Sequence, residues 1–265
     1  LDLATTWIAA VDVIGDSELS AGARVQAAEK LDDRRADGWL REAVELHMAR
    51  PGHHDDAMHL LEMLMERRPD DPEPAMQLEQ LAAQSGDWLR RMKVGRIILQ
   101  RGLDSERRND RLRVMADIAT QRLHDVDQAL ALLQEVEARN ATEAASTTER
   151  MIQVALSGGR QAMVADLLNT VVDEAADDYA AVEALSRRAQ ARAGTGDLDG
   201  AMVDLDQALS RGGDALRIAA MRTELADQAG RLDVVVSALE AWALELPVGE
   251  ARAAVLYRLA RSLAK

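Results

Sequence analysis

Residues 53–62, HHDDAMHLLE, combine the residue types that bind divalent metal ions. The candidate ligands are His53, His54, Asp55, His59 and Glu62. On a helix, Asp55, His59 and Glu62 share one face, because they are spaced i, i+4 and i+7. A metal site also needs a preorganised further ligand, and the sequence shows none at a suitable spacing. We therefore interpret the stretch as a polar helix start, capped by Asp55 or Asp56, and predict no metal and no cofactor.

Residues 195–209, TGDLDGAMVDLDQAL, have the acidic and glycine positions that suggest a calcium loop. An EF-hand loop needs oxygen ligands at its positions 1, 3 and 5, Gly at 6 and Glu at 12. Counted from Asp197, positions 5, 6 and 12 are Ala201, Met202 and Ala208. Since none of these side chains binds calcium, the sequence excludes this type of site.

A turn between two helices explains the same residues. Gly196 adopts the left-handed conformation that ends a helix more readily than other residues. Asp197 then caps the next helix, and Asp199 adds negative charge to its first turn. On that helix, Asp204 and Asp206 are expected to face solvent.

Catalysis finds little support in the residue types. The chain has no cysteine, and its serines lie without a matching His and Asp set. The double glycines Gly158-Gly159 and Gly212-Gly213 lack the flanking strand and lysine of a phosphate-binding loop. We predict that the chain is not an enzyme.

The formal charge of −14 predicts repulsion from nucleic acid. A basic belt nevertheless occupies residues 90–113, and Trp88 is the only aromatic side chain near it. Two interpretations stay open for the belt: a solvated helix face paired with acidic neighbours, or a dock for an acidic partner.

The ends of the chain suggest a piece of a longer protein. No run of apolar residues is long enough for a membrane span, and the start, LDLATTWIAAVDVIGD, lacks the features of a signal peptide. The cytoplasm is therefore the expected compartment. The first residue is Leu rather than Met.

Breaker residues recur along the chain at intervals of 34 to 38 residues. They lie at Gly15-Asp16, Gly52-His53, Gly86-Asp87, His124-Asp125, Gly158-Gly159, Gly196-Asp197 and Gly230-Arg231. Looser breaks fall about halfway between them, near Asp37-Gly38, Pro69–Pro74, Asp104-Ser105, Asn140-Ala141, Asp177-Asp178 and Gly212-Gly213. Each unit therefore contains two segments.

The segments have helical periodicity. In 125–139, the apolar residues follow the i, i+3, i+4, i+7 pattern of one buried face. No segment alternates as a strand does. We predict an all-α chain of about fifteen helices, with a last helix over 248–264.

The units resemble the tetratricopeptide repeat, a helix–turn–helix unit of 34 residues. GDLDGAMVDLDQAL matches it best, with Gly196 at the turn, Ala201 and Ala208 at the small positions and Leu205 in place of an aromatic residue. GHHDDAMHLLEMLMERRP and HDVDQALALLQEV are further matches, whereas the unit at Gly86 has Arg91 and Gly95 where Ala and a large residue belong. The resemblance implies one right-handed α-solenoid over 1–265, with about seven repeats plus the last helix.

The resemblance also implies a concave groove, lined by the first helix of each repeat, that binds a peptide or a partner protein. By register, and with two arginines of the basic belt, the candidate binding residues are Gln77, Gln80, Arg107, Arg108, Arg111, Met115, Gln121, Arg122, Arg187, Gln190, Arg217, Met221 and Glu224. We predict a non-enzymatic scaffold for protein partners.

Two alternatives to this scaffold stay open. One is self-assembly through the apolar ends of the array, at Leu3, Trp7, Ile8, Val11 and Ile14 and at Leu256, Leu259 and Leu263. The other is a regulatory module of a larger enzyme.

Overall fold

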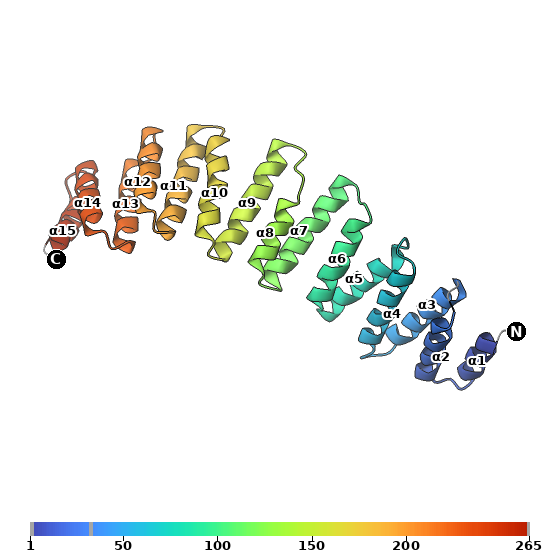
Figure 1. The fold of residues 1–265 in the computed structure, drawn as a ribbon. Helices are drawn as coiled ribbons and strands as arrows, with labels where there is room; N and C mark the ends of the chain where they lie inside the picture. Colours follow the sequence, from blue (N-terminus) through green and yellow to red (C-terminus); the bar gives the residue numbers. More distant parts are fainter. Residues whose placement is uncertain (1–2, 32–33, 264–265) are drawn as a thin grey trace. The chain divides into compact units, whose positions relative to one another are not determined.

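The computed structural model describes residues 3–31 and 34–263, and within them every regular element is an α-helix (Figure 1). In chain order the helices are α1 (Leu3–Asp12), α2 (Ser17–Glu29), α3 (Arg34–Met48), α4 (His54–Arg67), α5 (Glu73–Ser85), α6 (Trp88–Gln100), α7 (Ser105–Gln121), α8 (Val126–Gln134), α9 (Ala141–Ser157), α10 (Gln161–Asp173), α11 (Asp178–Gly194), α12 (Leu198–Ser210), α13 (Ala215–Gln228), α14 (Leu232–Glu245) and α15 (Glu250–Leu263). The prediction of an all-α helical repeat is confirmed.

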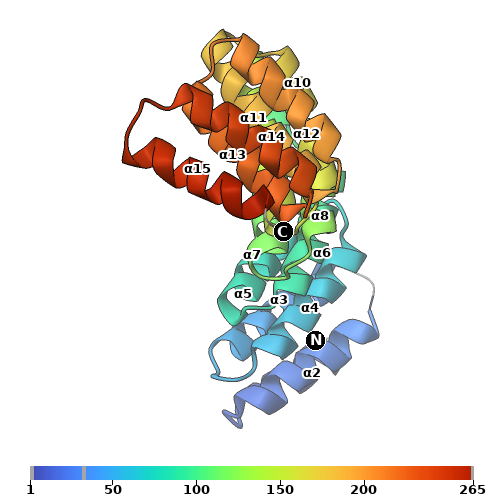
Figure 2. The ribbon, with the colours of Figure 1, turned by 90° about the vertical axis from the view of Figure 1, so that its left-hand side faces the viewer.

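The chain divides into two compact units, Leu1–Glu137 and Ala138–Lys265. Unit 1 contains α1 to α8, and unit 2 contains α9 to α15. Within each unit, helices that follow one another in the chain pack together, as Figure 2 shows for α13 to α15. The single array over 1–265 stays a prediction.

The seven predicted repeat turns all contain a residue in the left-handed region. Positive φ angles occur at Gly15, Gly52, Gly86, His124, Gly159, Gly196 and Gly230. Each of these turns joins an odd-numbered helix to the next even-numbered one, from α1–α2 to α13–α14. His124, with φ of 54°, is the one non-glycine residue in this region among the described residues. The turns therefore define seven helical hairpins, followed by α15.

Many helices begin after an Asp or Asn residue, whose side-chain oxygen accepts a hydrogen bond from a free backbone N–H of the first turn. Asp104, Asn140 and Asp177 each accept a hydrogen bond from a backbone N–H of the helix that follows. Asp197 does the same for the N–H of Gly200. Five of the six predicted halfway breaks are confirmed as gaps between helices.

The break predicted at Asp37-Gly38 is wrong, because both residues lie inside α3. Gly38 is tolerated in a helix interior at a cost of about 1 kcal/mol relative to Ala. Asp37 is held by Arg67 Nε at 3.0 Å and by Arg68 Nε at 2.6 Å, both near the end of α4. An aspartate that sequence patterns assign to a turn thus joins two helices. The helix predicted over 125–139 is also shorter, since α8 ends at Gln134.

Small and aliphatic side chains form the core of each unit. Ala57, Ala129, Ala201 and Ala208, which the repeat pattern places at close approaches, are each 0% exposed. The predicted register of these repeats is therefore confirmed. The atypical unit at Gly86 compensates locally, because Met115 fills the space beside Gly95, where a Cβ atom would lie 2.8 Å from its sulfur.

Arg24 joins the first three helices. Its guanidinium binds the carboxylate of Asp12 through two nitrogens, at 2.7 and 2.8 Å, and its Nε binds Glu42 at 2.7 Å. Hydrogen bonds from Arg24, and then from Ser20, lower the pKa of Asp12 to about 2. The carboxylate form of Asp12 is thus favoured by folding.

We expect Asp12→Asn to flatten the acid limb of the stability curve of unit 1. Because folding lowers the pKa of Asp12 from 3.8 to about 2, its contribution is present above about pH 4 and is lost as the pH falls toward about 2. The measurement is the melting temperature between these pH values. Glu29→Gln, at an exposed position on α2, is the control and keeps the wild-type slope. If Asp12→Asn and wild type showed the same slope, the lowered pKa of Asp12 would not be the source of the acid dependence.

Candidate functional site

Hollows lie between the first helices of consecutive hairpins, which are the odd-numbered helices. One of them, with a volume of about 720 Å³, lies between α5 and α7 in unit 1. Met76, Ile98 and Val114 supply apolar lining, and Arg107 and Arg111 line it together with Asp70, Glu79 and Asp110. Two of the predicted binding residues therefore line a common hollow.

A smaller hollow of about 230 Å³ lies between α3 and α5. Gln77, Gln80 and Gln84 come from α5, and Met48 and Leu61 supply apolar surface. Glu45 provides the one charged side chain of its lining. The predicted residues Gln77 and Gln80 are both exposed here.

Unit 2 has a hollow of the same composition between α11 and α13, with a volume of about 490 Å³. Gln190 and Gln228 lie in its lining together with Gln161, which packs over Gly194. Met221 supplies apolar surface, and Glu224 is again the one charged side chain. Three predicted residues, Gln190, Met221 and Glu224, are thus brought together.

The hollows α3–α5 and α11–α13 each contain three glutamines, one methionine and one glutamate. A glutamine amide both donates and accepts hydrogen bonds, as a peptide group does. A methionine adapts its shape to different apolar side chains. Such a hollow is suited to bind an extended peptide, with the glutamines contacting its backbone and the methionine contacting one apolar side chain.

The second helices form a hollow as well. It has a volume of about 460 Å³, lies between α4 and α6, and its lining combines Met65, Val94 and Ile97 with several charged residues. It contains none of the predicted binding residues.

Several predicted binding arginines instead connect neighbouring hairpins. Each pairs with a carboxylate on the first helix of the preceding hairpin. The pairs are Arg111 with Glu79 at 2.8 Å, Arg187 with Glu149 at 2.9 Å, and Arg217 with Glu183. Arg258 on α15 repeats the arrangement with Asp227 on α13, at 2.9 Å. The more exposed of these ion pairs contribute about 0–1 kcal/mol each, and all four connect one hairpin to the next.

The pKa values of the carboxylates reflect these pairs. The hydrogen bond from Arg217 lowers the pKa of Glu183 below its usual range. Burial alone would raise the pKa of Glu149, but hydrogen bonds from Arg187 and Gln153 lower it. Both carboxylates are therefore charged at neutral pH and hold their arginines in place.

The basic belt at 90–113 is largely paired within unit 1. Glu135 lies 2.5 Å from Arg96 and 3.4 Å from Arg108. Arg90 contacts Glu62 at 3.2 Å, and Arg107 contacts Asp104 at 3.4 Å. The pairing favours the interpretation as a neutralised helix face over a dock for an acidic partner.

Three further predicted binding residues, Met115, Gln121 and Arg122, lie within α7 or directly after it. Met115 is 2% exposed, so its prediction as a partner contact is wrong, because it fills the space beside Gly95. Gln121 is exposed, and Arg122 lies over the ring of Trp88, with its guanidinium carbon 5.0 Å from the ring centroid.

Asp204 corrects a prediction, since it is 0% exposed rather than turned to solvent. Arg188 donates to it at 2.7 and 3.1 Å, and Arg192 donates at 3.0 Å. Arg188 also donates to Asn169 Oδ1 at 2.8 Å. This buried network joins α10, α11 and α12. Asp206 is exposed, as predicted.

The predicted ligands Asp55, His59 and Glu62 lie on one face of α4, as their spacing requires, but Arg90 shares that face, 3.8 Å from Asp55 and 3.2 Å from Glu62. His59 Nδ1 lies 4.0 Å from Glu62, whose carboxylate is bound by Arg90, and Asp55 is 90% exposed. His54 is half-buried. The predicted cap is also wrong, because the N-cap residue is His53 and it forms no side-chain cap bond.

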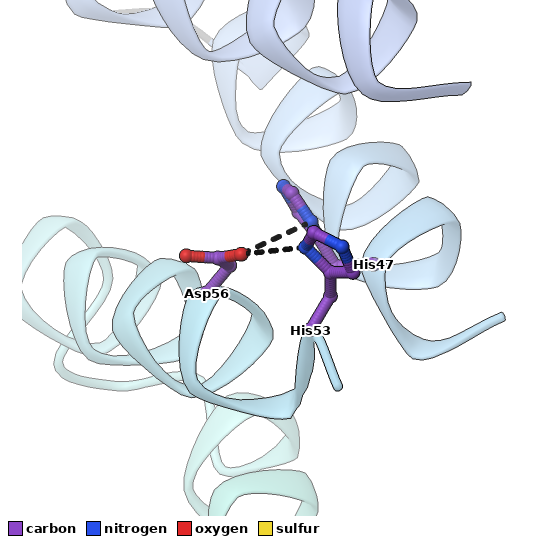
Figure 3. Close-up of side chains that lie close together, drawn as sticks. All are labelled: His47, His53 and Asp56. Carbon is purple, nitrogen blue, oxygen red and sulfur yellow. Dashed lines mark hydrogen bonds and ion pairs between the residues drawn. The ribbon is translucent and has the colours of Figure 1, made fainter. Parts of the chain in front are cut away.

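His53 instead lies beside His47 and Asp56 (Figure 3). Burial lowers the pKa of His47, an effect that outweighs the opposing charge of Asp56. The spacing of residues 53–62 does not identify His47, because His47 lies on the other helix of the hairpin.

Comparison with models of known protein families finds no match, and no curated protein matches the sequence. Comparison with solved structures finds the structure of Naa15/Naa10 bound to HypK-THB, at 13% identity and a TM-score of 0.58, covering 98% of this chain and 39% of that chain. A tetratricopeptide repeat protein from Parabacteroides merdae matches at 11% identity and a TM-score of 0.33, covering 98% and 97%. The P58(IPK) TPR domain matches at 12% identity and a TM-score of 0.33, covering 94% and 75%.

The hairpins, their left-handed turns and their close-approach alanines have the pattern of the tetratricopeptide repeat. The fold is tetratricopeptide-like. The tetratricopeptide-like chain spans about two fifths of the length of the Naa15/Naa10 chain that it matches. In the part of it that the structure describes, no helix combines the length and the apolar character needed to cross a bilayer.

Proposed function

We propose that this chain is a non-enzymatic scaffold that binds extended peptide segments of protein partners along its first helices. The observation that carries the proposal is the repeated composition of the hollows α3–α5 and α11–α13. Each unit places three glutamines around an apolar surface that contains a methionine. The glutamine amides supply hydrogen bonds to a peptide backbone, and the methionine receives one apolar side chain.

In this proposal, amide and apolar groups bind the partner, and free charges do not. Most of the predicted binding arginines are engaged with carboxylates of the same unit, as Arg111, Arg187 and Arg217 show. The two glutamine hollows contain neither arginine nor lysine. A partner segment of low charge therefore suits them better than an acidic one. The Naa15/Naa10 assembly, which shares the fold, is itself bound to HypK-THB.

Selection of random linear peptides displayed on phage, with the immobilised chain as target, tests this proposal. Affinities of selected peptides are then measured by fluorescence anisotropy. We expect Gln77→Ala/Gln80→Ala/Gln84→Ala, or Gln190→Ala/Gln228→Ala, to weaken them by about tenfold or more, because each lost hydrogen bond contributes about 0.5–1.5 kcal/mol. Alanine favours helix, so these variants keep the fold.

The control variants replace exposed glutamines of second helices, Gln134→Ala on α8 and Gln207→Ala on α12. They should leave the affinity unchanged. The proposal fails if no linear peptide is selected, or if the first-helix and second-helix variants lose affinity equally.

Self-association is the second candidate, and exposed apolar side chains favour it. Leu3 is 89% exposed, Ile14 67%, Tyr257 67% and Leu263 64%. Ile8, which was predicted to belong to this surface, is buried. Offering untagged copies of the chain to the same immobilised chain distinguishes the two candidates, because only self-association retains them.

A further inference from the structure

The turn of the second hairpin brings two imidazoles and one carboxylate together. His47 lies in the last turn of α3, His53 is the N-cap residue of α4, and Asp56 lies in the first turn of α4. Gly52, with φ of 86°, reverses the chain between the two helices. All three side chains therefore belong to one hairpin of unit 1.

The three side chains lie close enough together to chelate one ion. Their ligand atoms lie within 4.8 Å of one another. Asp56 Oδ2 is 2.9 Å from His53 Nδ1 and 3.8 Å from His47 Nδ1. Ligands bound at about 2.1 Å around a tetrahedral ion are separated by about 3.4 Å, a value between these two distances. In Figure 3, both rings present a nitrogen to the same carboxylate oxygen.

The unpaired state of His47 Nδ1 supports a cation site independently of these distances. This atom is buried and forms no hydrogen bond with any described residue. The oxygen that it faces, 3.8 Å away, is too far for a hydrogen bond. The two rings stack, with centroids 5.7 Å apart and planes 28° from parallel. A cation between the three atoms would give His47 Nδ1 the partner that it lacks.

We propose that His47, His53 and Asp56 bind a divalent transition-metal ion of the zinc type. Imidazole nitrogens select zinc, cobalt and nickel, whereas calcium and magnesium prefer all-oxygen sites. The exposed side of Asp56 leaves room for a water molecule as the fourth ligand. Arg50, the nearby cation, is paired with Glu18 at 3.1 Å, which offsets its repulsion of the ion.

A bound ion links the end of α3 to the start of α4 and so stabilises this hairpin. Because the ion binds the folded hairpin and not the unfolded chain, it raises the melting temperature, and the rise grows with the logarithm of the ion concentration divided by its Kd. The neighbouring His54 and His59 lie outside the cluster. They therefore provide matched controls on the same helix.

The test titrates the tag-free, metal-free chain with Zn²⁺, and with Co²⁺ to read the coordination geometry from its visible spectrum. We expect Zn²⁺ to raise the melting temperature of the wild type and of His59→Ala. The variants His47→Ala and His53→Ala should lose about tenfold or more in affinity. Asp56→Asn keeps the shape of an exposed side chain, so it tests the site even if His47→Ala misfolds.

Calcium and magnesium, at the same concentrations, should leave the melting temperature unchanged. The proposal is overturned if Zn²⁺ binds all these variants and His59→Ala with equal affinity. It is also overturned if Ca²⁺ stabilises the chain as well as Zn²⁺ does, because binding would then reflect the net charge of −14.

Discussion

Replacing Asp204 with alanine is expected to lower the free energy of unfolding of unit 2 by about 3–5 kcal/mol, because it leaves a buried arginine without its counter-charge. Asp204 is 0% exposed, and the side chain of Arg188 is only 10% exposed. Arg192, at 28%, keeps more access to water and so has a smaller share in the loss. Urea unfolding followed by circular dichroism measures the change.

Two further variants make this result specific. Asp199→Ala, on the same helix at a position 90% exposed, should change the free energy of unfolding by about 0.5 kcal/mol or less. Arg188→Met/Asp204→Leu should recover most of the loss, because apolar side chains of similar volume replace a buried ion pair well. Equal midpoints for Asp204→Ala and Asp199→Ala would show that the network contributes nothing.

The second large effect is expected at the close-approach alanines. Ala129→Trp on α8 and Ala201→Trp on α12 insert an indole at positions that are 0% exposed. Overpacking a filled core costs about 1–3 kcal/mol or more, so each variant should melt well below the wild type. Because the two alanines lie in different units, the two variants test the predicted register independently.

The controls place the same indole on the exposed side of the same helices. Gln134→Trp and Gln207→Trp should melt close to the wild type. If Ala201→Trp melted no lower than Gln207→Trp, the assignment of α12 to a packed hairpin would be in error.

Local signals explain why so much of the fold follows from the sequence. A left-handed turn nearly always needs glycine, so Gly52, Gly86 and Gly196 identify hairpin turns without any knowledge of their surroundings. The spacing of Ala201, Leu205 and Ala208 identifies the buried face of one helix in the same way. Both signals depend only on residues that are close in the sequence.

The errors concern side chains whose partners lie on another helix. Helix periodicity assigns Asp204 to the solvent face, yet it is buried and paired with Arg188 and Arg192 on the preceding helix. Asp37 with Gly38 resembles a turn, but Arg67 at the end of α4 and Arg68 directly after it hold Asp37 inside a helix. Periodicity within one helix carries no information about such partners.

In the candidate site, too, the sequence predicts positions on one helix but not contacts between helices. Register alone places Gln77, Gln80 and Gln190 on the first helices, and they line hollows. Register does not show that Arg187 and Arg217 are held by carboxylates one hairpin away. Nor does it bring His47 to His53, because the two residues lie on either side of a turn.

The most direct test of peptide binding on the first helices is site-specific photocrosslinking. A photoreactive residue is placed at Gln80 or Gln190 in the glutamine hollows, and at Gln134 or Gln207 on second helices, and each chain is irradiated with a selected peptide. We predict crosslinks from positions 80 and 190 and none from 134 and 207. Crosslinks from the second-helix positions alone would contradict peptide binding along the first helices.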